Sequence, residues 1–300
     1  MRILRSPGQT GSLRMTLAHT LTLAGAAAAQ ELPSRWDELT ASDWPKAMER
    51  SARTCILPIG ILEKHGPHGP LGSDIIHVRE LAARTTKKEY AVTFPDYFYG
   101  QINEARHQPG TFALPARLVW DMLEATCDEI GRNGFQRIVI INGHGGNPSL
   151  LRYFVQTRLE RRRDYVVYFY DPEPDPDLEE RVAALRRSDP AFDLHAGESE
   201  TSRLLYEQGD LVRLDRAKDE SGADQKRLSI PDLYTAIWWY ARFPNHYAGE
   251  GDKATRELGQ LMIEARIDRF ARALKTVKAD TRSLELQKEF FDRVDRLGRH

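Results

Sequence analysis

The chain has 300 residues, with 43 basic and 44 acidic side chains, so its formal net charge is −1. This balance provides no basic face of the kind that nucleic-acid binding requires, and we expect no nucleic-acid partner. Hydrophobic residues make up 41% of the chain and aromatic residues 9%, which is ordinary for a globular protein. After residue 30 the sequence contains no apolar run long enough to predict a membrane span.

The first thirty residues differ in composition from the rest. Three arginines give a positively charged start, and the small, apolar run at residues 15–29 ends in alanines. This order is typical of a secretory signal peptide cleaved near Ala29. We therefore expect residues 1–29 to be a signal peptide and residues 30–300 to form one periplasmic or secreted domain. A disordered N-terminal extension is the alternative.

Short apolar runs alternate with amphipathic patterns in the first half of this domain. The predicted strands span residues 55–62, 90–100, 137–143 and 165–171. The predicted helices around them span residues 78–89, 118–134 and 148–163. Strands that alternate with helices indicate crossover connections, and hence an α/β fold with a mainly parallel sheet.

The second half is richer in loops. An acidic, proline-rich segment follows residue 172, and a loop runs into a helix at residues 195–209. Residues 218–250 read as loop, and two charged amphipathic helices are predicted at residues 253–278 and near 283–296. The two cysteines, Cys55 and Cys127, are predicted to be buried thiols, and two cysteines make no disulfide framework even where export would permit a bridge.

The stretch "LEKHGPHGPLGSD" concentrates possible metal ligands at the end of the first predicted strand. Glu63 and His65 are two residues apart, so alternation places both side chains on one face. The glycines and prolines that follow predict a tight reversal that returns Asp74 to the same place. In an open parallel sheet, ligands gather beyond the carboxyl ends of the strands.

Two further motifs supply polar side chains of the same kinds. In "IINGHGGN", His144 follows another buried strand, and the glycine spacing matches neither nucleotide-binding fingerprint. In "HAGESETS", His195, Glu198 and Glu200 precede or begin a helix. Glu200 is equally compatible with helix capping, with Ser199 as the N-cap and acidic residues in the first turn.

Together, "LPIGILEKHGPHGPLGSD", "GFQRIVIINGHGGN" and "HAGESETSRLL" resemble the motifs of the creatininase (creatinine amidohydrolase) family, in matching order across roughly residues 35–275. The resemblance implies a three-layer α/β/α sandwich around a mainly parallel sheet. It also implies a two-metal centre, hydrolysis of non-peptide C–N amide bonds and a homo-oligomer, often a hexamer.

The family's site residues carry over position by position. The resemblance assigns Glu63 and His144 to one metal, His65 to the other, and Asp74 to both. Creatinine-hydrolysing members take a further ligand from a glutamate at the position of Gly146. We expect Glu198 to replace that ligand, and His195 matches the family's catalytic histidine.

The resemblance thus implies a metal-dependent amidohydrolase for a small-molecule cyclic amide or formamide. Two divalent cations, Zn, Mn or Fe(II), would activate a bridging hydroxide, and His195 would carry the proton to the leaving nitrogen. A non-catalytic metal- or ligand-binding member and a small-peptide hydrolase are the alternatives. Creatinine itself is not the expected substrate, because residues 172–194 lack the tryptophans that creatinine-specific members place there.

Several other polar and aromatic residues are weaker candidates. Possible substrate contacts are His68, His107, His246 and Glu200. His68 is expected to support the turn or line the entrance, and the other two histidines are equally compatible with surface positions. Trp238, Trp239 and Tyr240 are candidates for a pocket wall or an oligomer interface.

Overall fold

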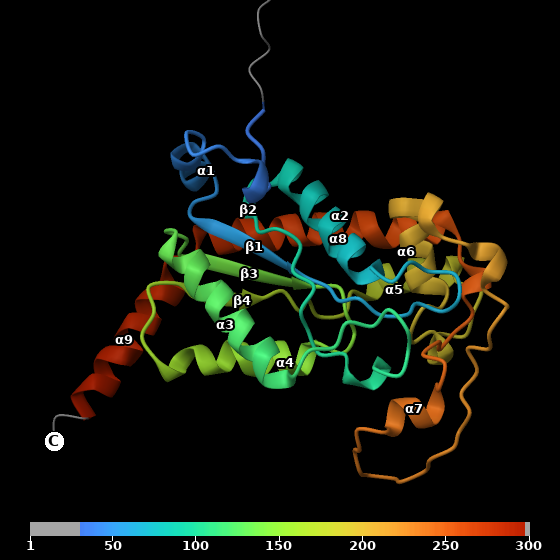
Figure 1. Cartoon of the computed structure of the whole chain (residues 1–300). Helices are drawn as coiled ribbons and strands as arrows, with labels where there is room; N and C mark the ends of the chain where they lie inside the picture. Colours follow the sequence, from blue (N-terminus) through green and yellow to red (C-terminus); the bar gives the residue numbers. More distant parts are fainter. Residues whose placement is uncertain (1–30, 298–300) are drawn as a thin grey trace, which may run out of the picture. The chain divides into compact units, whose positions relative to one another are not determined.

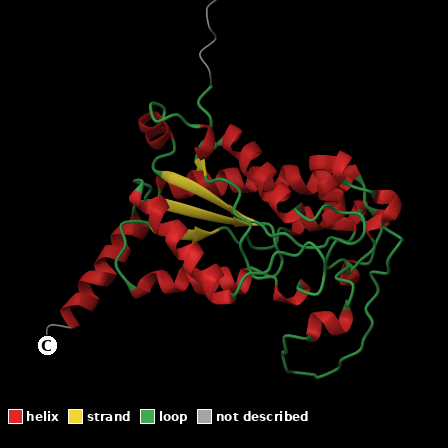
Figure 2. Cartoon of the chain, viewed as in Figure 1, coloured by secondary structure: helices red, strands yellow, loops and turns green. Residues whose placement is uncertain are grey.

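The computed structural model describes residues 31–297, and the residues from Leu32 onward form one compact unit. The predicted signal peptide, residues 1–29, lies outside the described residues. Within the unit, a four-stranded sheet is covered by helices (Figure 1, Figure 2).

All pairings in the sheet are parallel, as the sequence predicted. The strands are β1 (Thr54–Ile59), β2 (Val92–Thr93), β3 (Arg137–Asn142) and β4 (Val166–Phe169), in the order β2-β1-β3-β4. The strand predicted at 90–100 is reduced to β2. Pro95 follows it and has no N–H to donate, so the chain continues beside β1 through separate hydrogen bonds, such as Tyr97 N–H to Pro58 O.

Alternate side chains of β1 and β3 enter two different apolar layers. Cys55, Leu57 and Ile59 of β1 pack with Ile138 and Ile140 of β3 on one face, and Ile56, Val139 and Ile141 pack on the other. The first face is covered by α3 (Ala116–Arg132) and α4 (Pro148–Gln156), the second by α2 (Ser73–Lys88) and α8 (Arg256–Ala279). Both faces of the sheet are therefore buried, which confirms the three-layer α/β/α arrangement.

The remaining helices are α1 (Trp44–Arg50), α5 (Pro176–Leu185), α6 (Glu198–Gln208), α7 (Trp238–Arg242) and α9 (Arg282–Leu297). A long loop after α6 leads to α7 (Figure 1). Among residues 31–297, no helix is both long and apolar enough to cross a membrane. Cys55 and Cys127 are buried free thiols, and burial raises the pKa of each.

Helix α2 begins five residues earlier than the sequence predicted, at Ser73 instead of residue 78. Asp74 therefore lies in the first turn of α2 and not in the preceding loop. The helix dipole favours a carboxylate in this first turn. The first turn rests directly on the main chain at the carboxyl ends of β1 and β3. A Cβ added to Gly60 would lie 2.5 Å from the amide nitrogen of Ile75, and one on Gly143 would lie 2.4 Å from the carbonyl oxygen of Asp74.

This close approach predicts that Gly143→Ala destabilises the fold. The added methyl group must push away the first turn of α2, because its nearest neighbour is main chain and cannot rotate aside. We expect the free energy of unfolding to fall by about 1–3 kcal/mol in denaturant titrations. Gly145→Ala is the matched control, since nothing lies within 4 Å of its added Cβ. Equal stability of the two variants would contradict this account.

Candidate functional site

Four of the predicted metal ligands meet at the carboxyl edge of the sheet. They are Glu63, His65, Asp74 and His144, and each is at least nine-tenths buried. Glu63 and His65 lie in the extended segment beyond β1, which ends at Ile59 and not at residue 62 as predicted. Asp74 comes from α2, and His144 follows β3. Three chain segments thus supply one cluster.

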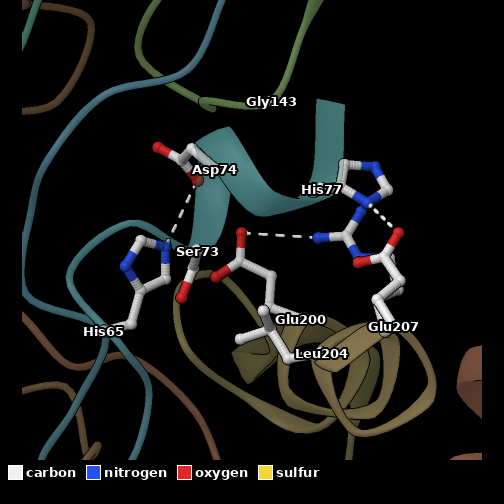
Figure 3. A pocket seen from close by; sticks show the side chains of 9 residues that line it. His65, Ser73, Asp74, His77, Gly143, Glu200, Leu204 and Glu207 are labelled. Atoms are coloured by element: carbon white, nitrogen blue, oxygen red, sulfur yellow. Dashed lines mark hydrogen bonds and ion pairs between the residues drawn. The ribbon is translucent and has the colours of Figure 1, made fainter. Parts of the chain in front are cut away.

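Asp74 lies between the two histidines of this cluster. Its Oδ1 is 3.3 Å from Nε2 of His65 (Figure 3), and its Oδ2 is 3.3 Å from Nδ1 of His144. Glu63 Oε1 lies 2.8 Å from the same His144 nitrogen. One carboxylate therefore faces both imidazoles, which is the arrangement expected of a residue shared by two metals.

Four buried atoms of the cluster make no well-formed hydrogen bond among the described residues, and three of them face only another member of the cluster, at 2.8–3.3 Å. They are Glu63 Oε1, His65 Nε2, Asp74 Oδ2 and His144 Nε2. Buried polar atoms are nearly always paired, so unpaired atoms gathered in one place require an explanation. Glu63, Asp74 and His144 can place ligand atoms within 4.8 Å of one another, as can Glu63, His65 and His195. Carboxylate and imidazole donors at such spacing fit divalent cations.

The charges of the cluster are mutually dependent. Burial alone would raise the pKa of Glu63, but His144 and His195, with a hydrogen bond from His246, hold it well below its usual range. Burial alone would lower the pKa of His65, but Asp74 and then Glu63 raise it to about 9. The pKa of His144 is raised for the same reason. A cation bound here would replace these imidazole protons, since a ligating histidine must be neutral.

His195 lies beside the cluster and is 8% exposed. Its ring is 4.6 Å from that of His65, and its Nε2 is 2.7 Å from the carbonyl oxygen of Lys64. A carbonyl only accepts, so Nε2 carries a proton and donates it. The other nitrogen, Nδ1, is left 3.6 Å from Glu200 Oε2 and is the atom available for proton exchange.

The structure does not bring Glu198 into the cluster. Its side chain is fully buried and accepts hydrogen bonds from the main-chain N–H groups of Arg187, at 2.8 Å, and Ser188, at 2.6 Å. Glu198 is the first residue of α6, and its carboxylate faces the loop after α5. The expected substitution of Glu198 for the ligand missing at Gly146 is thus not supported by its position. Sequence spacing cannot tell which side of a helix start faces the crevice.

Glu200, two residues further on, faces the cluster instead. It lines a small cavity with His65 and Asp74, and Figure 3 shows its carboxylate rising from α6 toward them. Its Oε2 accepts a 2.6 Å hydrogen bond from Ala196 N–H. Burial opposes its ionisation, but His195, His65 and Arg203 outweigh burial and lower its pKa. Arg203, three residues along α6, is a contact that sequence reasoning missed.

His246 was expected as a possible substrate contact, and the structure places it against a metal-ligand candidate. Its Nε2 lies 2.6 Å from Glu63 Oε2, and its Nδ1 accepts the indole N–H of Trp239 at 2.7 Å. Burial is the main reason why its pKa is lowered. Trp239 also stands 6.1 Å from the ring of His195, so the aromatic side chain beside the site comes from α7.

Two other histidines lie outside the cluster. His68 is buried and its Nε2 is 2.8 Å from Thr201 Oγ1, a supporting contact between the turn and α6. Burial, assisted by His65, lowers the pKa of His68 to about 4. His107 is exposed, and its Nε2 is 2.7 Å from the carbonyl oxygen of Pro244. His107 therefore contacts the turn after α7 and is not among the residues that can share a cation.

A family model described as "Creatininase: Creatinine amidohydrolase" matches residues 37–274. The chain belongs to the creatininase family. Among curated relatives, creatinine amidohydrolase of Pseudomonas putida is 26% identical over 257 residues, covering 79% of this chain and 95% of that protein. The mycofactocin precursor peptide peptidase of Mycolicibacterium smegmatis is 31% identical over 170 residues, 53% of this chain and 60% of its own length.

Solved creatininases share the fold. A crystal structure of creatinine amidohydrolase (creatininase) matches with a TM-score of 0.68 and 23% identity, covering 83% of this chain and 99% of that one. Two more are described as "Creatininase Mn" and as a creatininase variant of "Zn-Zn type", with TM-scores of 0.66 and 0.68 and identities of 24% and 23%. Each of these two matches spans 82% of this creatininase-family chain and 99% of the solved chain.

The observed contacts of Glu198 predict a structural role for it. Glu198→Ala leaves the buried N–H of Ser188 and the partly buried N–H of Arg187 without an acceptor. We expect the free energy of unfolding to fall by about 3 kcal/mol in denaturant titrations. Glu180→Ala on the exposed side of α5 is the control, with an expected change of less than about 0.5 kcal/mol. An unchanged Glu198→Ala midpoint would show that these hydrogen bonds do not stabilise the fold.

Proposed function

We propose that this creatininase-family hydrolase is a metal-dependent amidohydrolase that cleaves a non-peptide C–N amide bond of the cyclic amide or formamide type. One observation carries the proposal: the buried carboxylates and imidazoles of Glu63, His65, Asp74 and His144 converge beside His195 at the spacing of metal ligands. Membership of a family that includes creatinine amidohydrolase supports the same reaction class. Export and a homo-oligomeric, hexameric assembly stay predictions.

The residues divide between two proposed cation positions. Glu63 and His144 would hold one cation, His65 the other, and Asp74 would contact both. Divalent ions such as the Mn and Zn named for solved creatininases would supply Lewis acidity toward an amide carbonyl and toward water. We propose Glu200, in place of Glu198, as the further carboxylate ligand. It lines the same cavity as His65 and Asp74, and its pKa is lowered, which keeps it ionised.

His195 is proposed to move the proton that the leaving nitrogen requires. The carbonyl of Lys64 fixes one ring nitrogen, so the ring cannot rotate away without losing that hydrogen bond. Nδ1 can then accept or release a proton, and Glu200, 3.6 Å away, stabilises the charged ring. Nδ1 of His195 is thus the nitrogen proposed to carry the proton, on a ring that lies against the proposed ligands Glu63 and His65.

An amide panel tests the reaction class. Protein loaded with Mn or Zn would be assayed against cyclic ureides, formamides and short peptides, with elemental analysis of the same samples. We expect two metal equivalents per chain and hydrolysis of a cyclic amide or formamide that stops on chelation. Turnover of peptides alone would favour a peptidase, the activity of the 31%-identical relative. Less than one equivalent after supplementation would contradict the two-metal proposal.

Two substitutions separate the proposed proton carrier from the proposed ligand. His195→Ala should retain both metal equivalents while turnover falls by about 10²-fold or more, because only the proton transfer is lost. Glu200→Gln should lose one metal equivalent, because an amide is a poorer ligand than a carboxylate. Metal content and turnover would be measured on each variant. If His195→Ala lost metal while Glu200→Gln kept full occupancy, His195 would be the ligand and the assignment of Glu200 as a ligand would be wrong.

A further inference from the structure

Glu63 has a second layer of support behind it. Its carboxylate faces His144 on one side, and on the other it meets His246, which in turn meets Trp239. All three side chains in this row are buried, with exposed fractions of 1% for Glu63, 2% for His246 and 9% for Trp239. Water therefore does not compete for their hydrogen bonds, and each group depends on its neighbour.

The direction of each hydrogen bond follows from chemistry. An indole N–H can only donate, so the 2.7 Å contact makes His246 Nδ1 an acceptor. A neutral imidazole that accepts at Nδ1 carries its proton on Nε2. That proton is donated to Glu63 Oε2 across 2.6 Å. Trp239 thus selects the tautomer of His246, and the tautomer makes His246 a donor to Glu63.

The hydrogen bond from His246 gives the two oxygens of Glu63 different roles. Oε2 accepts the hydrogen bond from the His246 imidazole, while Oε1 faces the other candidate ligands and lies 2.8 Å from His144 Nδ1. A carboxylate fixed at one oxygen cannot rotate about its terminal bond without losing the buried hydrogen bond. Oε1 is therefore aimed at the other candidate ligands before any cation arrives.

The main chain at His246 is held in an unfavourable conformation that serves this contact. Its φ is +56°, in the left-handed region, which costs energy for any residue with a Cβ. The N–H of His246 donates to the carbonyl of Phe243 at 3.0 Å, and the Trp239 ring packs on Phe243 at 4.9 Å between centroids. The turn after α7 is thus fixed by packing, and it directs the imidazole inward.

We propose that Trp239 and His246 are positioning residues that orient Glu63, so that Oε1 alone is presented to a divalent cation. This inference rests on the proposed function, because it concerns the affinity of the same site for metal. Hydrogen-bonded partners of metal ligands commonly contribute 10- to 100-fold to metal affinity, so the effect should be measurable without any substrate.

Removal of the imidazole is the first test. Asparagine tolerates a left-handed φ but ends short of Glu63, so His246→Asn removes the donor with little strain on the turn. We expect Mn²⁺ and Zn²⁺ to bind about 10- to 100-fold more weakly in competition titrations with a chelator. Thermal unfolding of the metal-free protein would check that the variant is folded.

Removal of the indole N–H is the second test, and it leaves His246 in place. Trp239→Phe keeps an aromatic ring in the layer but no donor for Nδ1. We expect a measurable loss of metal affinity, of up to about tenfold. We also expect the ¹⁵N shifts of the His246 ring to change in the metal-free protein, because the Nε2–H tautomer is no longer selected. Trp238→Phe is the matched control, since Trp238 packs on Trp239 at 5.3 Å but lies outside the hydrogen-bonded row.

The outcomes distinguish the two proposals. Wild-type affinity in both His246→Asn and Trp239→Phe, in protein whose parent binds metal, would overturn the positioning role and leave the amidohydrolase proposal intact. A metal-free wild type whose His246 carries its proton on Nδ1 would overturn the positioning role alone. A wild-type protein that binds no divalent cation would overturn both proposals. If His246→Asn does not fold, Trp239→Phe and the ring shifts decide the question.

Discussion

The arrangement of the site depends on two carboxylates that are buried at the carboxyl ends of the strands. Glu63 and Asp74 are removed from water, so each needs positive charge close by. The surrounding imidazoles supply it, as the raised pKa values of His65 and His144 indicate. A divalent cation, as proposed for this site, would supply positive charge in place of these shared protons.

This balance can exist only where several segments converge. The parallel sheet brings the ends of β1 and β3 to one edge, and α2 returns over them to add Asp74. Helix α6 brings Glu200, and the turn after α7 brings His246 from more than 180 residues away along the chain. The loop-rich second half of the chain thus completes a centre whose frame is built by the first half.

The sequence predicted the frame well and the details of the second half less well. The strands at β1, β3 and β4 and the gathering of Glu63, His65, Asp74 and His144 follow from apolar runs, motif order and the rule for parallel sheets. The position of Glu198 could not be predicted, because Glu198 and Glu200 lie two residues apart in the same motif. Only the position of the Arg187–Ser188 loop decides which carboxylate turns away from the cluster. The role of His246 depends on a donor from Trp239 and on a left-handed turn, neither of which has a periodic signal.

The contact between α2 and the strand ends has a consequence for how sequences of this fold can diverge. At Gly60 and Gly143 the separation is limited by main-chain atoms, which every amino acid shares. Substitutions in the surrounding apolar layers can change the tilt of the helix or the volume of the core. They cannot bring these backbones closer, and only a larger residue at either glycine would force them apart. The spacing of the carboxylate on α2 from its partners can thus stay constant while most of the interior is replaced.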